Sequence, residues 1–214
     1  MRGSIGVIGS GMVGQTLAAG LARHGYAVTI GSRTPEKLAD WQRKEAPQVR
    51  LATTEEAARA GDVVIVAVAG GAAEETVRSV ADALAGKVVI DTGNPISGPP
   101  VNGVIPYFTG PNDSLMERLQ KAVPAARFVK AFCSVGAGFM IDPKLPGGPP
   151  TMFICGNDAG AKATVSEILT EVGWEPYDVG GVEAARAVEP LAVLWCAPGF
   201  LRGDWAHAFK MLKP

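Results

Sequence analysis

Three glycines near the start of the chain have the spacing of a phosphate-binding turn. Gly9, Gly11 and Gly14 follow a short apolar run and form the pattern GxGxxG. Because glycine has no Cβ, such a turn brings the backbone close to a pyrophosphate, and the helix that begins inside it offers free N–H groups to the anion. In a strand–turn–helix unit the pattern indicates a dinucleotide site. The complete turn reads Gly9-Ser10-Gly11-Met12-Val13-Gly14.

The end of the second expected strand favours one dinucleotide over the other. An NAD enzyme places Asp or Glu there to bind the ribose 2′-hydroxyl. This chain has Ser32, Arg33 and Thr34 instead, with Lys37 one turn into the following helix. A hydroxyl and two cations suit a 2′-phosphate, and a charge-assisted hydrogen bond from Arg33 is worth about 1.5–3 kcal/mol. We therefore expect NADP(H) as cofactor; the alternative is that Arg33 and Lys37 are solvated residues at a helix start.

An acid or base for catalysis is harder to find. His24 ends the first expected helix and His207 lies near the C-terminus, so both are expected to be surface or packing residues. No Ser-His-Asp, Cys-His or paired-carboxylate arrangement can be assembled on the cofactor side. A carbonyl substrate needs a proton donor, whereas a flavin-like ring delocalises the charge and takes its proton from water. Four other residues could exchange a proton: Asp91, Tyr107, Lys130 and Asp142. Asp91 and Lys130 are equally well explained as structural residues.

The cysteines are odd in number and far apart. Cys133, Cys155 and Cys196 match neither a disulfide framework nor a zinc-ligand spacing, so free thiols are expected. Cys133 lies just past an expected strand end and next to Ser134, which permits a redox role. A free cysteine more often acts as a small hydrophobe, and that interpretation is favoured here.

The elements that must hold these residues alternate between strand and helix, as in a parallel sheet covered on both faces. The pattern predicts an α/β fold, a Rossmann-like doubly wound and mostly parallel sheet with a short helical C-terminal extension. The expected strands are 3–8, 26–31, 49–52, 62–68, 87–91, 126–131, 151–156 and 175–179. The expected helices are one that passes through Val13, Leu17 and Leu21 and stops at Gly25, and others at 53–60, 72–85, 112–121 and 159–172.

Two long loops, 92–111 and 133–150, are rich in Gly and Pro and follow expected strands, at the edge where open α/β sheets bind ligands. We expect one domain, 1–214, with a core at 1–180 and a helical segment at 181–214 that breaks at Pro198-Gly199. The apolar residues of this segment exceed what it can bury on its own domain, which predicts a homodimer contact. They are Leu191, Leu194, Trp195, Trp205, Phe209 and Leu212.

Composition limits the partners. The chain has 214 residues and a formal net charge of −1, without a run of like charges, so neither a nucleic acid nor an acidic membrane surface is expected. The partner is expected to be a small-molecule hydride acceptor. The apolar stretch 5–8 is too short for a signal sequence or a spanning helix, which favours a cytoplasmic protein.

Taken together, the motifs resemble those of the NADPH-dependent coenzyme F420 (deazaflavin) reductases. They also resemble the cytosolic oxidoreductase domain of the STEAP-type ferric reductases. The likeness extends over nearly the whole chain. The segments that carry it are Ile8-Gly9-Ser10-Gly11-Met12-Val13-Gly14, Gly31-Ser32-Arg33-Thr34, Asp91-Thr92-Gly93-Asn94-Pro95, Val129-Lys130-Ala131-Phe132, Glu189-Pro190-Leu191 and Leu194-Trp195.

This resemblance implies that hydride passes between NADPH and a deazaflavin (coenzyme F420) or flavin stacked over the nicotinamide. It assigns Ser32, Arg33 and Lys37 to the 2′-phosphate, and Asn94 and Pro95 to the nicotinamide side. It assigns Val68, Ala69 and Gly70 to the turn beneath the cofactor, and Phe132, Cys133, Ser134, Val135 and Gly136 to a wall between the two rings. The chain differs from the family at this wall: the ferric reductases have Asn-Thr, and the deazaflavin reductases a His, in the region of Cys133 and Ser134.

Two other functions fit the residues. One is an NADPH-dependent reductase of a small carbonyl or imine compound. Such enzymes usually add a long helical domain after the sheet, where this chain has only about thirty residues, short of a separate domain. The other is a non-catalytic NADP-binding module that kept the fold and lost the chemistry.

Overall fold

Six parallel strands form the main sheet in the computed structural model, which describes residues 2–213. Their order is β3-β2-β1-β4-β5-β6, so the chain reverses direction across the sheet between β1 and β4. This is the strand order of a Rossmann fold, which confirms the expected fold class. The strands are β1 (Ser4–Ile8), β2 (Ala27–Gly31), β3 (Arg50–Ala52), β4 (Val63–Val66), β5 (Val88–Asp91) and β6 (Arg127–Lys130).

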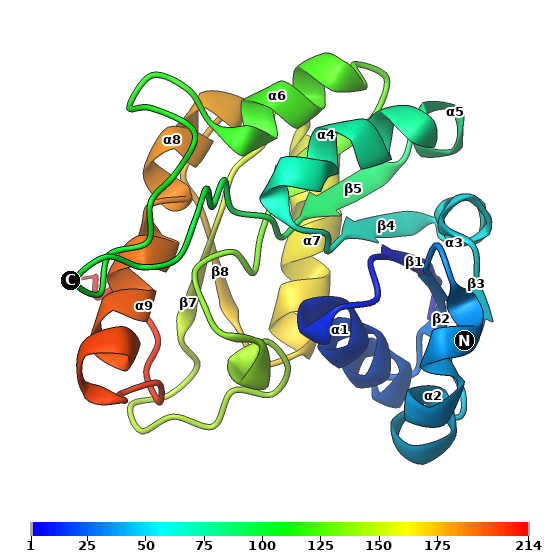
Figure 1. Ribbon diagram of the computed structural model, residues 1–214, viewed down its shortest axis with the longest axis horizontal. Helices are drawn as coiled ribbons and strands as arrows, with labels where there is room; N and C mark the ends of the chain where they lie inside the picture. Colours follow the sequence, from blue (N-terminus) through cyan, green and yellow to red (C-terminus); the bar gives the residue numbers. More distant parts are fainter. Residues whose placement is uncertain (1, 214) are drawn as a thin grey trace.

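The strands β1, β4, β5 and β6 divide their side chains between two cores. In β4, Val63 and Ile65 pack into the core on one face, and Val64 and Val66 pack into the core on the other. Helices therefore cover both faces, which is why this run lacks polar alternation. The first core is completed by α1 (Met12–Arg23) and α7 (Ala159–Glu171), and the second by α4 (Gly70–Ser79), α5 (Ala81–Leu84) and α6 (Leu115–Ala122) (Figure 1).

Local capping sets several helix boundaries. Thr53 and Glu56 form a capping box that starts α3 (Thr54–Ala60), because each side chain accepts a hydrogen bond from the other's backbone N–H. The helix predicted from residue 112 begins instead at Leu115, since Ser114 caps it by accepting from the Glu117 amide. The helix predicted at 72–85 also differs: it starts at Gly70 and is interrupted at Val80. After β2 the chain forms a 3-10 turn, Pro35–Leu38, and then α2 (Ala39–Glu45).

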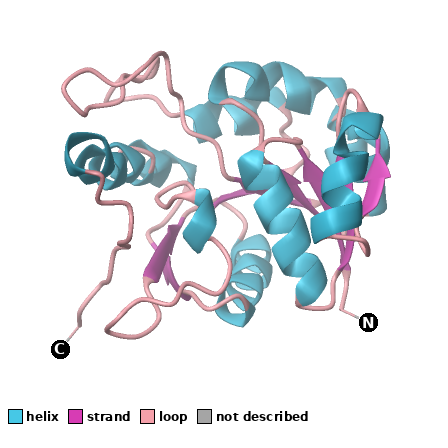
Figure 2. Cartoon of the chain, turned by 60° about the horizontal axis from the view of Figure 1, so that its bottom comes forward, coloured by secondary structure: helices cyan, strands magenta, loops and turns pink. Residues whose placement is uncertain are grey.

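The last two strands form a parallel sheet of their own. β7 (Thr151–Ile154) pairs with β8 (Glu175–Asp178), and the pair meets the main sheet at one antiparallel bridge, where the Lys130 amide donates to the Cys155 carbonyl at 2.9 Å. Figure 2 shows this short sheet on the side of the molecule where the C-terminal segment lies. The strands were expected from sequence, but their separation from the main sheet was not.

The C-terminal segment contains a 3-10 turn, Val182–Ala184, α8 (Ala185–Val188) and α9 (Leu191–Arg202). The break predicted at Pro198-Gly199 is wrong, because α9 continues through both residues and ends at Gly203, which has a φ of +72°. Proline removes one helical hydrogen bond but does not always end a helix. Here Trp205 packs so closely on Gly199 that a Cβ there would lie 2.3 Å from its ring, and this packing holds the last turn.

Among the described residues, Val182–Arg202 is the one helical segment long and apolar enough to cross a bilayer, and 33% of its most apolar stretch is buried. Core helices of soluble proteins reach the same length and apolar composition. The segment also contains Glu189, whose side chain is buried in an ion pair with Lys130. That contact fixes the segment to the main sheet.

Candidate functional site

A cleft of about 620 Å³ lies at the C-terminal ends of β1, β2 and β4. This is the point where the strand order reverses, and open α/β sheets bind ligands at that position. Eight of the residues expected at the cofactor line it: Gly9, Ser10, Gly11, Ser32, Arg33, Thr34, Val68 and Ala69. Seven do not line it: Met12, Val13, Gly14, Lys37, Gly70, Asn94 and Pro95.

The glycine turn brings a bare helix end to this cleft. A Cβ on Gly14 would lie 2.0 Å from the Gly9 carbonyl oxygen, so α1 can approach the turn only with glycine at this position. Within residues 2–213 no side chain caps α1, and its first N–H groups are left for an anion. Met12 is 77% exposed beside the turn, whereas Val13 packs against the core.

The loop after β2 is tied to the glycine turn by a serine. The Ser32 hydroxyl donates to the Ser10 hydroxyl and accepts from the Thr34 amide, each at 3.2 Å. Arg33 lines the cleft and is exposed, and Lys37 is exposed in the neighbouring 3-10 turn. In the part of the chain that the structure describes, neither cation forms an ion pair, so both charges are available to a phosphate.

The opposite side of the cleft was not predicted from the sequence. It is formed largely by one face of α4, where Ala72, Glu75, Thr76 and Ser79 recur at helical spacing, together with Thr54 at the start of α3. Helical periodicity could identify this face, but it could not say that the face turns toward the glycine loop.

The residues expected near the nicotinamide meet beside the cleft. A Cβ on Gly70 would lie 2.1 Å from the Asn94 carbonyl oxygen, so the start of α4 packs directly on the loop after β5. The Asn94 side chain reaches the loop after β6, where its Nδ2 donates to the Cys133 carbonyl at 2.9 Å. The three strand ends are thus joined by one backbone approach and one side-chain hydrogen bond.

The expected wall between the rings presents few side chains. Phe132, Cys133, Ser134 and Val135 are all buried, and Gly136 abuts the Trp195 ring. Phe132 has a φ of +63°, which turns the chain sharply after β6 and costs a non-glycine residue about 1–2 kcal/mol. This stretch therefore supports Asn94 through the Cys133 carbonyl, and its side chains point into the protein.

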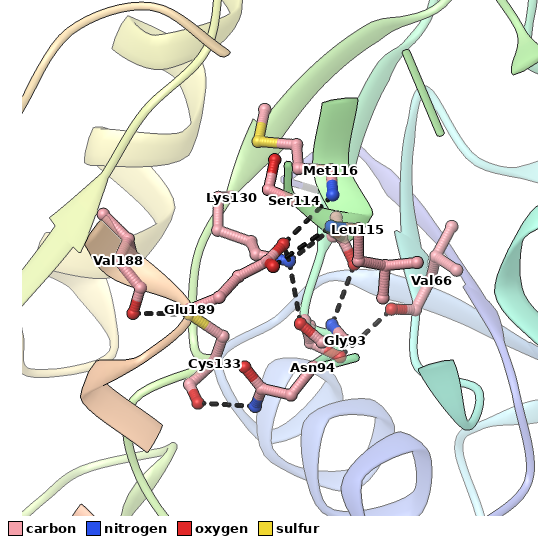
Figure 3. Close-up of polar contacts among 12 residues, drawn as sticks. Val66, Gly93, Asn94, Ser114, Leu115, Met116, Lys130, Cys133, Val188 and Glu189 are labelled. Carbon is pink, nitrogen blue, oxygen red and sulfur yellow. Dashed lines mark hydrogen bonds and ion pairs between the residues drawn. The ribbon is translucent and has the colours of Figure 1, made fainter. Parts of the chain in front are cut away.

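A buried ion cluster lies next to the turn that carries Asn94 (Figure 3). The Lys130 Nζ contacts Asp91 Oδ2 at 2.6 Å, Glu189 Oε1 at 2.7 Å and the Gly93 carbonyl oxygen at 2.7 Å. The Lys130 and Asp91 side chains are 0% exposed and that of Glu189 is 2% exposed. Three partners satisfy all three ammonium donors, as a charge without access to water requires.

The electrostatics favour a charged Lys130 and neutral Cys133 and Tyr107. Burial lowers the pKa of Lys130, but the negative charges of Asp91 and Glu189 outweigh it, so the pKa lies above its usual value. Burial raises the pKa of Cys133 to about 12 and also raises the pKa of Tyr107. A protonated, buried thiol is a poor nucleophile, which supports the hydrophobic interpretation of Cys133.

The remaining candidates for proton transfer have structural partners. His24 Nε2 contacts the Asp142 carboxylate at 3.0 Å, and His207 Nε2 contacts the Trp195 carbonyl at 2.9 Å. The Tyr107 hydroxyl donates to the Glu189 carbonyl at 2.9 Å. The expectation that both histidines are surface or packing residues is confirmed. Within residues 2–213 no cluster of His, Cys, Asp and Glu is suited to hold a metal ion.

Known proteins similar to this chain include NADP reductases and metalloreductases. Residues 4–95 match the profile of a family described as NADP oxidoreductase, coenzyme F420-dependent. The F420-dependent NADP reductase of Methanothermobacter marburgensis is 31% identical over 196 residues, which cover 87% of each chain. The metalloreductase STEAP3 of Rattus norvegicus is 33% identical over 202 residues. These residues cover 92% of this chain but only 38% of that protein.

A solved structure shares the whole architecture. The crystal structure of a protein assigned as an F420-dependent NADP reductase, from Arthrobacter sp. FB24, has a TM-score of 0.91 to this chain at 32% identity. The match covers 99% of this chain and 100% of that one. The likeness therefore includes the short sheet and the C-terminal segment as well as the Rossmann half.

The environment of Cys133 predicts how the native protein reacts with iodoacetamide. At pH 8, about four units below the raised pKa, the Cys133 thiol is protonated and buried, so we expect alkylation only after unfolding in urea. Half-buried Cys196 is the internal control and should react first. Mass spectrometry of the peptides measures both sites, and rapid native labelling of Cys133 would restore a redox role.

Proposed function

The chain belongs to the coenzyme F420-dependent NADP oxidoreductase family, with NADP(H) as its cofactor, and on this premise we propose that it transfers hydride between NADPH and a deazaflavin. A flavin is the related alternative acceptor. The observation that carries the proposal is the cleft at the strand-order reversal, which is lined by a bare helix end and by Arg33 on the loop tied to it. Both features fit the phosphates of NADP(H) and serve no contact within the described chain.

In this proposal the two ends of NADPH are held by different means. The pyrophosphate lies on the N–H groups at the start of α1, and the 2′-phosphate lies against Ser32 and Arg33, with Lys37 nearby. Ser32 is already oriented by its contacts with Ser10 and Thr34. At the other end, the hydrogen bond between the Asn94 side chain and the Cys133 carbonyl fixes the surface on which the nicotinamide would lie. When bound, NADPH supplies the hydride.

The chemistry left to the protein is positioning and exclusion of water. Two titratable groups described near the proposed nicotinamide end are engaged: Lys130 is fully buried with three partners, and the Tyr107 hydroxyl donates to the Glu189 carbonyl. Effective positioning alone can supply several kcal/mol of barrier reduction. A ring that delocalises the incoming charge and takes its proton from water fits such a site better than a ketone does.

An acceptor panel tests the proposed reaction. Purified protein is mixed with NADPH and, in turn, coenzyme F420, FMN, FAD and a set of ketones and imines, and the nicotinamide absorbance is followed. We expect turnover with F420 and slower turnover with flavins. Turnover with carbonyls or imines alone would contradict the proposal, and NADPH binding without turnover would favour a non-catalytic module.

Charge reversal at Arg33 tests the 2′-phosphate contact. Arg33→Asp removes a charge-assisted hydrogen bond worth about 1.5–3 kcal/mol, so the ratio of kcat/KM for NADPH over NADH should fall by roughly one to two decades. Lys44→Asp is the matched control, because it makes the same charge change on exposed α2 away from the cleft. An unchanged ratio in the Arg33 variant would show that the phosphate binds elsewhere.

We also propose that two copies of the chain associate through α9. Leu194, Phe200 and Leu201 are 60%, 46% and 57% exposed on this helix, and the neighbouring loop adds Val101 and Val104 at 66% and 53%. Trp195, expected at the same surface, is instead buried at 6%. An apolar patch of this kind marks an interface more often than free surface.

Light scattering after size exclusion tests this association. Leu194→Glu with Leu201→Glu places two charges on the patch, and we expect it to convert a dimer to a monomer. Val179→Glu, at an exposed apolar position after β8, is the control and should leave the dimer intact. A monomeric wild-type protein at micromolar concentration would contradict the proposal.

A further inference from the structure

The proposed nicotinamide end rests on a short turn, Gly93–Asn94. The buried ion cluster of Asp91, Lys130 and Glu189 holds this turn from the protein interior. We propose that Lys130 and Glu189 are positioning residues for hydride transfer, which act through this turn without touching the cofactor. The inference rests on the proposed function, since it concerns the surface on which the nicotinamide would lie. The contacts of each residue support it in turn.

The cluster binds both backbone polar groups of Gly93. The Lys130 Nζ donates to the Gly93 carbonyl at 2.7 Å, and the Gly93 amide donates to Asp91 Oδ1 at 2.8 Å. Asp91 is itself fixed, because its other carboxylate oxygen lies 2.6 Å from Lys130. Lys130 and Asp91 therefore hold Gly93 from two sides, and the turn can move only if this ion pair also moves.

Asn94 transmits this constraint to the surface. Its backbone is pressed against Gly70 and its Nδ2 donates to the Cys133 carbonyl. Its Oδ1 is buried and has no hydrogen-bond partner among the described residues. A buried acceptor without a donor costs stability, and such groups occur where function requires a particular geometry. The Asn94 side chain is thus held in place although only one of its two polar atoms has a hydrogen-bond partner among the described residues.

Glu189 joins the C-terminal segment to this arrangement. Its Oε1 lies 2.7 Å from Lys130 and accepts from the Met116 amide, while its Oε2 accepts from the Leu115 amide, both at 3.0 Å. One carboxylate therefore caps α6 and fixes Lys130 at the same time. Because its side chain is only 2% exposed, water cannot replace it. Loss of its charge should let Lys130 shift toward Asp91 and release the Gly93 carbonyl.

A second ion pair provides the comparison that separates positioning from stability. Arg186, whose side chain is 36% exposed, forms a bidentate contact with Glu117, whose side chain is 8% exposed, and this pair also links α6 to the C-terminal segment. It contacts no residue of 91–94. A merely structural role for Glu189 predicts that removal of either carboxylate lowers stability without a selective effect at the nicotinamide end, because an ion pair that loses one partner costs stability.

The experiment compares Glu189→Gln with Glu117→Gln. Two affinities are measured for each variant, for NADPH and for adenosine 2′,5′-bisphosphate, which occupies only the adenine end. We expect Glu189→Gln to reduce the ratio of the NADPH affinity to the bisphosphate affinity by about tenfold. It should also reduce kcat by about 10- to 100-fold, since a small misplacement of the reacting ring slows hydride transfer. Affinity for the bisphosphate should stay within about twofold of wild type, and Glu117→Gln should leave all three quantities unchanged.

A double-variant cycle tests whether the effect passes through the turn. In an Asn94→Ala background the surface is already lost, so Glu189→Gln should cause less than about a threefold further loss of kcat. If Glu189→Gln does not fold, Tyr107→Phe removes only the hydrogen bond to the Glu189 carbonyl, and it should lower kcat by about two- to fivefold at unchanged bisphosphate affinity.

Three results would overturn the inference. The first is that Glu189→Gln lowers kcat equally in the wild-type and Asn94→Ala backgrounds, and the second is that it weakens NADPH and bisphosphate binding in parallel. The third is that Tyr107→Phe lowers kcat to the same extent in both backgrounds. Failure of the proposed function has a different signature. In that case the wild-type protein would bind the bisphosphate and NADPH with equal affinity and would reduce no deazaflavin or flavin. Thermal unfolding of each variant accompanies the assays and identifies loss of fold.

Discussion

A lysine ammonium buried without access to water must be neutralised and fully hydrogen-bonded, and much of this protein is arranged around meeting that requirement for Lys130. Asp91 supplies one negative charge from the adjacent strand, and Glu189 supplies another from a residue close to the C-terminus. Glu189 also caps α6, and its carbonyl receives the Tyr107 hydroxyl from the long loop. One charge therefore ties two strands, a helix start, a loop and the C-terminal segment to one point at the edge of the sheet.

The two halves of the site consequently have different physical character. The end proposed for the adenine nucleotide is open, and it offers a bare helix end and exposed cations whose charges meet no partner in the described chain. The end proposed for the nicotinamide is held in place by close contacts, with Gly70 pressed on Asn94 and the Asn94 side chain bonded to the Cys133 carbonyl. Ionic contacts can give the first half its choice of NADP, while rigidity gives the second half its geometry. Cys133 fits this division, since it contributes its carbonyl to the Asn94 contact while its thiol is buried.

The sequence predicted those parts of the site that depend on neighbours along the chain. The turn at Gly9–Gly14 and the Ser32–Arg33 pair belong to single strand–helix connections, so their residue types and spacing specify them. The α4 face with Thr76 and Ser79 could not be predicted, because its place beside the glycine turn depends on how a later strand pairs with β1. Lys130 and Asp91 were expected to be structural, but nothing in their spacing indicated Glu189 as the second carboxylate, which is 59 positions beyond Lys130.

The sequence by itself therefore determined the fold class, the order of the strands along the chain and the preference for NADP, because these follow from local periodicity, capping and charge. Only the tertiary structure decided that β7 and β8 form a separate sheet, that α9 continues through Pro198, and that the expected wall at Phe132–Gly136 turns its side chains inward. Each of these depends on contacts between residues far apart in the chain: the single bridge at Lys130, the return of Trp205 onto Gly199, and the burial of an ammonium ion. Such contacts carry no periodic signal, since their energy comes from packing and charge compensation that exist only once the chain has folded.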